Sequence, residues 1–159
     1  MCSSDLDRAL DGSLVNIFSN SGQICIAGSR ILVQRGIAEA FIETFVARTR
    51  ALRVGDPLDP RTEVGPMAFE AHYRRVLEHI ERANSEGAQL LCGGEARPDL
   101  GEGYFIAPTV FQVTHNQLSL CQEEVFGPVV SIQVFDNDDD ALEVANDSRF
   151  GLVRSEEHT

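Results

Sequence analysis

A cysteine in a short polar loop, Cys25, is the first candidate for nucleophilic chemistry in this chain. The loop before it, residues 19–23, holds Ser, Asn, Ser, Gly and Gln, which favour turns rather than cores. Its Gly22 allows a tight turn and a close approach of the backbone to a ligand. The pattern fits an exposed, reactive thiol, but it also fits a buried structural cysteine, since free cysteines are often buried.

Two adjacent carboxylates, Glu123 and Glu124, form the second candidate for chemistry. They precede Phe126 and a Gly-Pro turn at 127–128, after which residues 129–135 alternate as a strand does. A glutamate pair before a turn is, taken alone, typical of a solvated surface.

The composition excludes several classes of function. The formal charge is −12, with thirteen arginines and no lysine, so no basic stripe is available for nucleic acid or for anionic membranes. No apolar run is long enough to span a bilayer, and the start lacks the pattern of a signal peptide. The four cysteines show no CxxC spacing, which argues against zinc. We expect no disulfides and a cytoplasmic location.

Alternating helix and strand patterns predict an α/β fold with a layered sheet. Helices are expected over residues 8–18, 37–52, 69–86 and 138–146, and strands over 31–34, 89–92, 104–106, 110–113 and 129–135. In the third helix Phe69 is expected to face inward, whereas His72 and His79 are expected to be partly exposed and not to bind metal. Pro108 suggests an edge strand or a bulge.

The loop around Cys25 resembles the catalytic-cysteine signature of the aldehyde dehydrogenase superfamily. The matching residues are Phe18, Asn20, Gly22, Gln23, Cys25, Ala27 and Arg30. Further segments resemble the family in the same order, at 54–66, 89–94, 103–110, 123–128 and 146–152. The segment 123–128 matches the family pattern Glu-Glu-Ile/Val-Phe-Gly-Pro at every position.

This resemblance implies an incomplete three-layer α/β/α catalytic domain over residues 7–153, with NAD or NADP as cofactor. Cys25 would attack a small aldehyde to give a thiohemiacetal and then a thioester, and the backbone N–H of Cys25 would help to stabilise the oxyanion. Glu124 would hold the hydroxyls of the nicotinamide ribose, and Phe126 would pack near the nicotinamide ring. The general-base glutamate and the dinucleotide-binding domain would lie upstream, and the parent protein would be a homodimer or homotetramer.

Two other functions remain open at this stage. The first is a CoA-acylating enzyme, in which a thiol rather than water accepts the acyl group. A general-base glutamate upstream in the parent protein would argue against this function. A non-catalytic relative would keep only the fold, and the cysteine standing unreplaced at position 25 counts against it.

Both ends resemble translated sequencing adapter. Residues 154–159 match one reading frame of a common library adapter, and residues 2–6 match its opposite end. We therefore expect residues 1–6 and 154–159 to be non-native. Because the resemblance places the general base and the dinucleotide-binding domain upstream, we also expect the polypeptide alone to be inactive.

Overall fold

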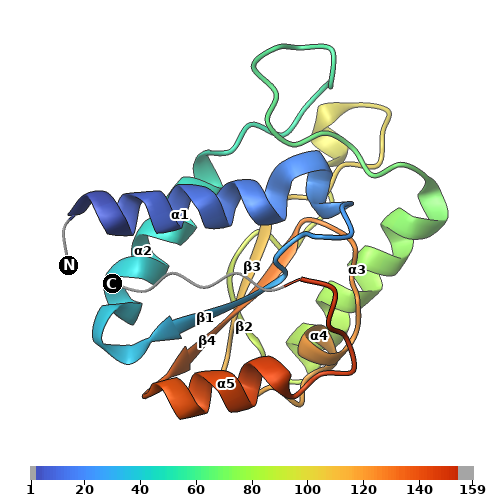
Figure 1. Ribbon diagram of the computed structural model, residues 1–159. Coiled ribbons are helices and arrows are strands. Elements are labelled where there is room, and N and C mark those ends of the chain that lie inside the picture. Colours follow the sequence, from blue (N-terminus) through green and yellow to red (C-terminus); the bar gives the residue numbers. More distant parts are fainter. Residues whose placement is uncertain (1–2, 154–159) are drawn as a thin grey trace.

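The computed structural model describes residues 3–153 (Figure 1). Its α-helices are α1 (Ser3–Phe18), α2 (Arg35–Ala51), α3 (Glu70–Ser85), α4 (Ser119–Gln122) and α5 (Asp138–Asn146). The strands are β1 (Arg30–Gln34), β2 (Gln89–Cys92), β3 (Thr109–Val113) and β4 (Val129–Phe135). Two short 3-10 helices, η1 (Ser19–Gly22) and η2 (Pro98–Leu100), complete the regular structure.

The four strands form one mixed sheet in the order β1-β4-β3-β2. The interior strand β4 runs parallel to both of its neighbours, and β2 closes one edge antiparallel to β3. Residues 129–132 of β4 are buried on both faces, as expected of a parallel strand covered by helices on each side.

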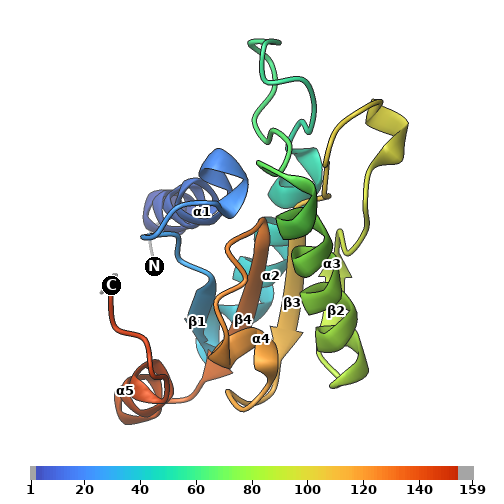
Figure 2. The same cartoon turned by 90° about the vertical axis from the view of Figure 1, so that its right-hand side faces the viewer.

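Helices cover both faces of this sheet and create two hydrophobic cores (Figure 2). One core lies under α1 and α2 and includes Phe45, Val130 and Ile132. The other lies under α3 and α4 and includes Phe111 and Val129. Because neighbouring residues of a strand point to opposite faces, Val129 and Val130 enter different cores. The predicted layered α/β fold is confirmed.

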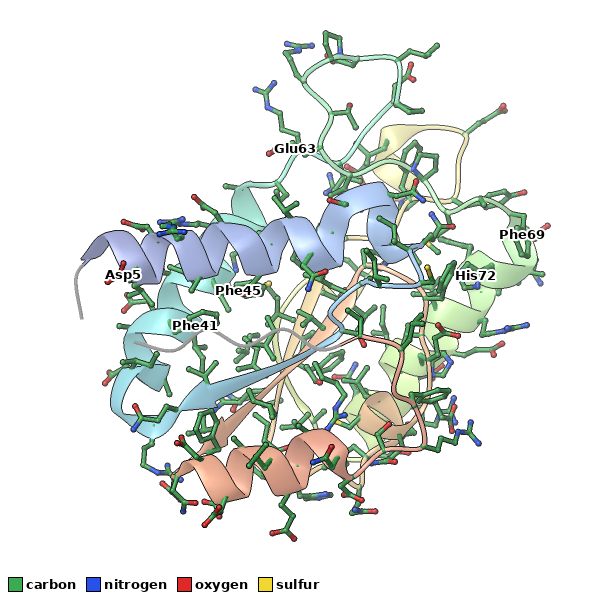
Figure 3. The ribbon with its side chains drawn as sticks, viewed as in Figure 1. Asp5, Phe41, Phe45, Glu63, Phe69 and His72 are labelled. Carbon is green, nitrogen blue, oxygen red and sulfur yellow. The ribbon has the colours of Figure 1, made fainter. Side chains whose placement is uncertain are left out.

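The long helices form because their apolar residues recur at helical spacing. In α2 the buried positions are 38, 41, 45 and 49, which lie on one stripe. The rings of Phe41 and Phe45, labelled in Figure 3, stack with centroids 5.7 Å apart, and Phe18 of α1 lies 6.3 Å from Phe45. Asn137 caps the N-terminus of helix α5, and its side chain accepts a hydrogen bond from the backbone N–H of Asp140.

The predicted helices are all present, but the expectations for residues 104–106 and for Phe69 are wrong. Residues 104–106 do not form a strand, because only Ile106 pairs, in an isolated bridge with Ala96. Phe69 is exposed rather than inward, since it occupies the N-cap of α3 with an extended backbone, ahead of the helical stripe. The short helix α4 was not predicted.

Pro108 does not mark an edge strand either. Pro108 immediately precedes β3, which is an interior strand. Proline has no backbone N–H to donate, but the hydrogen bonds between β3 and β4 begin only at the next residue, so none is lost. The first of these bonds is donated by Thr109 to the carbonyl of Pro128 at 2.8 Å. The irregularity in register lies instead in β2, between Leu90 and Cys92.

Truncating Phe45 to alanine should cost about 3–5 kcal/mol of unfolding free energy, because its ring is fully buried between two other aromatic rings. Phe150→Ala is the matched control, since that ring is 51% exposed, and it should change stability by less than about 0.5 kcal/mol. Urea denaturation of each variant measures the difference, and equal losses would contradict the assignment of Phe45 to the core.

Candidate functional site

The loop that carries Cys25 begins with a strained reversal of the chain after α1. Asn20, Ser21 and Gly22 are three consecutive residues in the left-handed region, with φ of 49°, 57° and 71°. The side-chain amide of Asn20 donates to the carbonyl of Gln23 at 3.0 Å and holds the turn. Backbone strain of this kind persists only where surrounding contacts enforce it, and it concentrates at functional sites. Beyond the turn, Cys25 is exposed.

Two hydrogen bonds fix this loop to the segment 65–68, which leads into α3. The hydroxyl of Ser21 donates to the carbonyl of Gly65 at 2.8 Å. The side-chain oxygen of Gln23 accepts from the backbone N–H of Ala68 at 3.0 Å. Ser21 is buried, so its bond is shielded from water. The polar residues before Cys25 therefore hold the loop in place, while the cysteine itself is exposed to solvent.

A direct backbone contact joins the Cys25 loop to the segment 123–128. A Cβ atom placed on Gly22 would lie 2.0 Å from the carbonyl oxygen of Gly127, which no side chain could tolerate. The positive φ of Gly22 adds a second reason for glycine at this position. The close approach expected at Gly22 is thus made to the chain's own backbone, and it brings together the two segments that the sequence singled out.

The backbone of Phe126 adopts an unusual conformation. Its φ is 55°, in the left-handed region that non-glycine residues rarely adopt, and its side chain is 37% exposed. The Phe126 carbonyl lies 2.6 Å from Nε2 of His72. Because a carbonyl can only accept, Nε2 must carry the proton of this bond. The rings of His72 and Phe126 lie 5.9 Å apart, and the ring of Phe69 lies 5.7 Å from that of His72 (Figure 3).

The two adjacent glutamates differ sharply in their surroundings. The guanidinium of Arg82 pairs with the Glu123 carboxylate at 3.0 Å and also lies 3.2 Å from Nδ1 of His79. Burial lowers the pKa of His79, and the charge of Arg82 lowers it further, although Glu123 opposes this shift. Glu124, in contrast, is exposed, and its carboxylate makes no ion pair or side-chain hydrogen bond with any residue from 5 to 153.

The structure corrects the expectation for the two histidines. His72 and His79 are buried rather than partly exposed, because they share the inward stripe of α3 with Val76 and Ala83. Within the part of the chain that the structure describes, no group of three His, Cys, Asp or Glu side chains is arranged to hold a metal ion. Sequence reasoning missed the contacts of His72 and Arg82. The available signal was the placement of His72 and His79 on the same helix face as Val76, with Arg82 one turn beyond His79.

The other described cysteines differ from Cys25 in burial. Cys92 and Cys121 are buried, and burial raises the pKa of both thiols. The Cys121 sulfur lies 3.8 Å from the Ser131 hydroxyl, inside the protein. Cys92 is packed in the core under α1 and α2. Of the cysteines in residues 3–153, only Cys25 is open to a small molecule from solvent.

The chain belongs to the aldehyde dehydrogenase family, whose family model matches residues 1–155. It is 43% identical over 149 residues to a betaine aldehyde dehydrogenase of Rhizobium leguminosarum bv. trifolii, covering 93% of this chain and 31% of that protein. Among solved structures it resembles HpcC from Thermus thermophilus, with a TM-score of 0.90, 46% identity, and coverage of 93% of this chain and 30% of that one. It also resembles a Mycobacterium tuberculosis aldehyde dehydrogenase complexed with NAD+, with a TM-score of 0.89, 38% identity, and coverage of 93% and 31%.

The chain therefore spans about a third of the length of these relatives. The proposed adapter-like ends stay a prediction: residues 1–2 and 154–159 lie outside the described residues, and residues 3–6 form the start of α1. No helix within residues 3–153 has both the length and the apolar character needed to cross a bilayer.

Replacing Gly22 by alanine should destabilise the chain by more than about 2 kcal/mol, because a Cβ there would overlap the Gly127 carbonyl and would strain a left-handed backbone. Gly12→Ala is the control: no atom lies within 4 Å of its Cβ position, so alanine should be neutral or stabilise α1 by up to about 1 kcal/mol. Thermal and urea unfolding compare the two, and a neutral Gly22→Ala would disprove the contact.

Iodoacetamide should modify Cys25 well before Cys92 and Cys121, because alkylation needs an accessible thiolate, and burial both hides the other two thiols and raises their pKa. Peptide mass spectrometry over a time course measures each rate in the native protein, and urea-unfolded protein gives the intrinsic rates. Similar native rates for Cys25 and Cys92 would argue for a non-catalytic relative.

Proposed function

We propose that this chain supplies the nucleophile and the coenzyme-binding carboxylate of an NAD(P)-dependent aldehyde dehydrogenase that converts an aldehyde to a carboxylic acid. The observation that carries the proposal is the backbone contact of Gly22 with Gly127, which places the loop of exposed Cys25 beside the segment of Glu124 and Phe126. The names of the relatives support the substrate class, since they include betaine aldehyde dehydrogenases and an enzyme complexed with NAD+.

The residues of the segment 123–128 fit a nicotinamide coenzyme. Glu124 offers two carboxylate oxygens that are uncommitted among residues 5–153, as recognition of the two ribose hydroxyls requires. Phe126 exposes an aromatic ring on a backbone that is held in place, which suits contact with a flat nicotinamide ring. When bound, the nicotinamide supplies the hydride acceptor that converts the thiohemiacetal to a thioester.

Cys25 performs the covalent chemistry. Its sulfur, as the thiolate, attacks the aldehyde carbon and forms a C–S bond, while the carbonyl π electrons move to oxygen. The backbone N–H of Cys25 is the donor in this chain assigned to that oxyanion. Loss of hydride leaves a thioester on the sulfur, and attack by water then releases the carboxylic acid and returns the thiolate. A thioester splits one difficult oxidation into two easier steps, which is why a cysteine is suited to this position.

The polypeptide alone is proposed to be inactive. Hydrolysis of the thioester needs a base that activates water, and the family resemblance places that glutamate, together with the dinucleotide-binding domain, outside the segments matched here. Cys25 and Glu124 by themselves provide a nucleophile and one coenzyme contact. We infer that turnover requires the remaining parts of a full-length family member.

The test uses a full-length protein that carries this chain. Cys25→Ser should lower kcat by at least about 1000-fold, because an alcohol at neutral pH is a far weaker nucleophile than a thiolate. Glu124→Gln should raise the KM for coenzyme about tenfold or more, since it weakens charge-assisted hydrogen bonds to the ribose. Aldehyde-dependent NADH formation measures both effects.

Glu143→Gln, an exposed glutamate on α5, is the matched control and should behave as wild type. The 159-residue chain is the negative arm of the same experiment and should form no NADH. Full activity of Cys25→Ser would overturn the proposed nucleophile, and turnover by the short chain would overturn its proposed inactivity.

A further inference from the structure

Helix α3 contacts the segment 123–127 at three points, two of them on its buried stripe and one at the edge of that stripe. Arg82 pairs with Glu123 near the C-terminal end of the helix, and His72 bonds the carbonyl of Phe126 near its N-terminal end. Between them lies Val76, whose methyl groups would be 2.8 and 2.9 Å from a Cβ on Gly127. Residues 72, 76 and 79 share one face because a helix repeats every 3.6 residues, and buried His79 in turn contacts Arg82.

We propose that this stripe of α3 positions the coenzyme-binding groups, with His72 as the principal positioning residue for Phe126. The inference rests on the proposed function, because it assigns to α3 the placement of groups that are proposed to bind the coenzyme. Neither His72 nor Arg82 is assigned a contact with the coenzyme itself.

The backbone of Phe126 explains why a hydrogen bond is needed at this point. A left-handed conformation is unfavourable for phenylalanine, so the segment would relax to an extended or right-handed geometry if nothing held it. The bond from Nε2 of buried His72 to the Phe126 carbonyl fixes the orientation of that peptide unit. Relaxation would also leave a buried imidazole N–H without an acceptor, which adds to the cost of leaving the observed state.

The two other contacts restrict the ends of the same segment. The absence of a side chain at Gly127 lets the backbone lie directly on Val76, so the segment cannot move closer to the helix. The Arg82 ion pair holds Glu123, and Glu124 follows directly with its carboxylate exposed. Groups that contact α3 thus alternate along the segment with the exposed side chains of Glu124 and Phe126. The contacts with α3 therefore determine the direction in which these two side chains point.

The test compares variants of the full-length protein by coenzyme affinity, kcat and melting temperature. His72→Leu removes the donor and should weaken NAD+ binding about tenfold, measured by isothermal titration calorimetry. His72→Gln keeps an N–H donor at a similar reach and should restore affinity to within about threefold of wild type. Arg74→Leu is the control: Arg74 lies on the same helix but pairs with exposed Glu70, so affinity should not change.

The outcomes separate this inference from the proposed function. If wild type binds NAD+ and His72→Leu binds it equally well, the positioning role is overturned while the proposed function stands. If wild type itself neither binds NAD+ nor depends on Cys25, the proposed function fails first. A purely structural role predicts that His72→Gln and His72→Leu lose affinity in step with melting temperature, and that result also overturns the inference. Should His72→Leu fail to fold, Arg82→Met removes the neighbouring contact of α3 with Glu123, and unchanged affinity there counts against the inference.

Discussion

The contact between the backbones of Gly22 and Gly127 is the constraint on which the site depends. Gly22 follows α1, whose Ile17 and Phe18 are buried in the core under α1 and α2. Gly127 lies between Val125 and Val129, which are buried in the core on the opposite face of the sheet. Two segments anchored in different layers therefore meet where neither has a side chain. Any larger residue at position 22 would separate the thiol loop from the carboxylate segment.

Around this contact, anchored and exposed residues alternate along the chain. Ser21 and Gln23 are hydrogen-bonded to the segment 65–68, and Cys25 is exposed just after them. Glu123 is held by Arg82, and Glu124 is exposed just after it. This arrangement fixes the backbone of each segment without using the groups that are proposed to react or bind. Preorganisation of this kind lowers the entropy cost of bringing reactants together.

Local patterns were sufficient to predict most of the fold. The spacing of Phe41 and Phe45 specified the buried face of α2, and the alternation in residues 129–135 specified β4. The polar loop before Cys25 correctly suggested a reversal of the chain, and membership of the aldehyde dehydrogenase family was recognised from the same residues.

What escaped prediction depends on contacts between distant residues. His72 and Phe126 are 54 positions apart, and nothing in either local sequence specifies their hydrogen bond or the left-handed φ of Phe126. Pro108 was misinterpreted because the interior position of the following strand β3, between β4 and β2, is likewise a property of the tertiary structure.

The division of the site between two hydrophobic cores has a consequence for its response to heat. Because the sheet lies between the cores and none of their side chains belongs to both, we expect that one core can loosen before the other. If the packing of either layer loosens, the segment anchored in that layer shifts, and the distance between the Cys25 sulfur and the Glu124 carboxylate changes. Most backbone hydrogen bonds remain intact in such a partly loosened state. Warming would therefore separate the Cys25 loop from the Glu124 segment before secondary structure is lost, and mutations that rigidify only one layer would raise the melting point without protecting this arrangement.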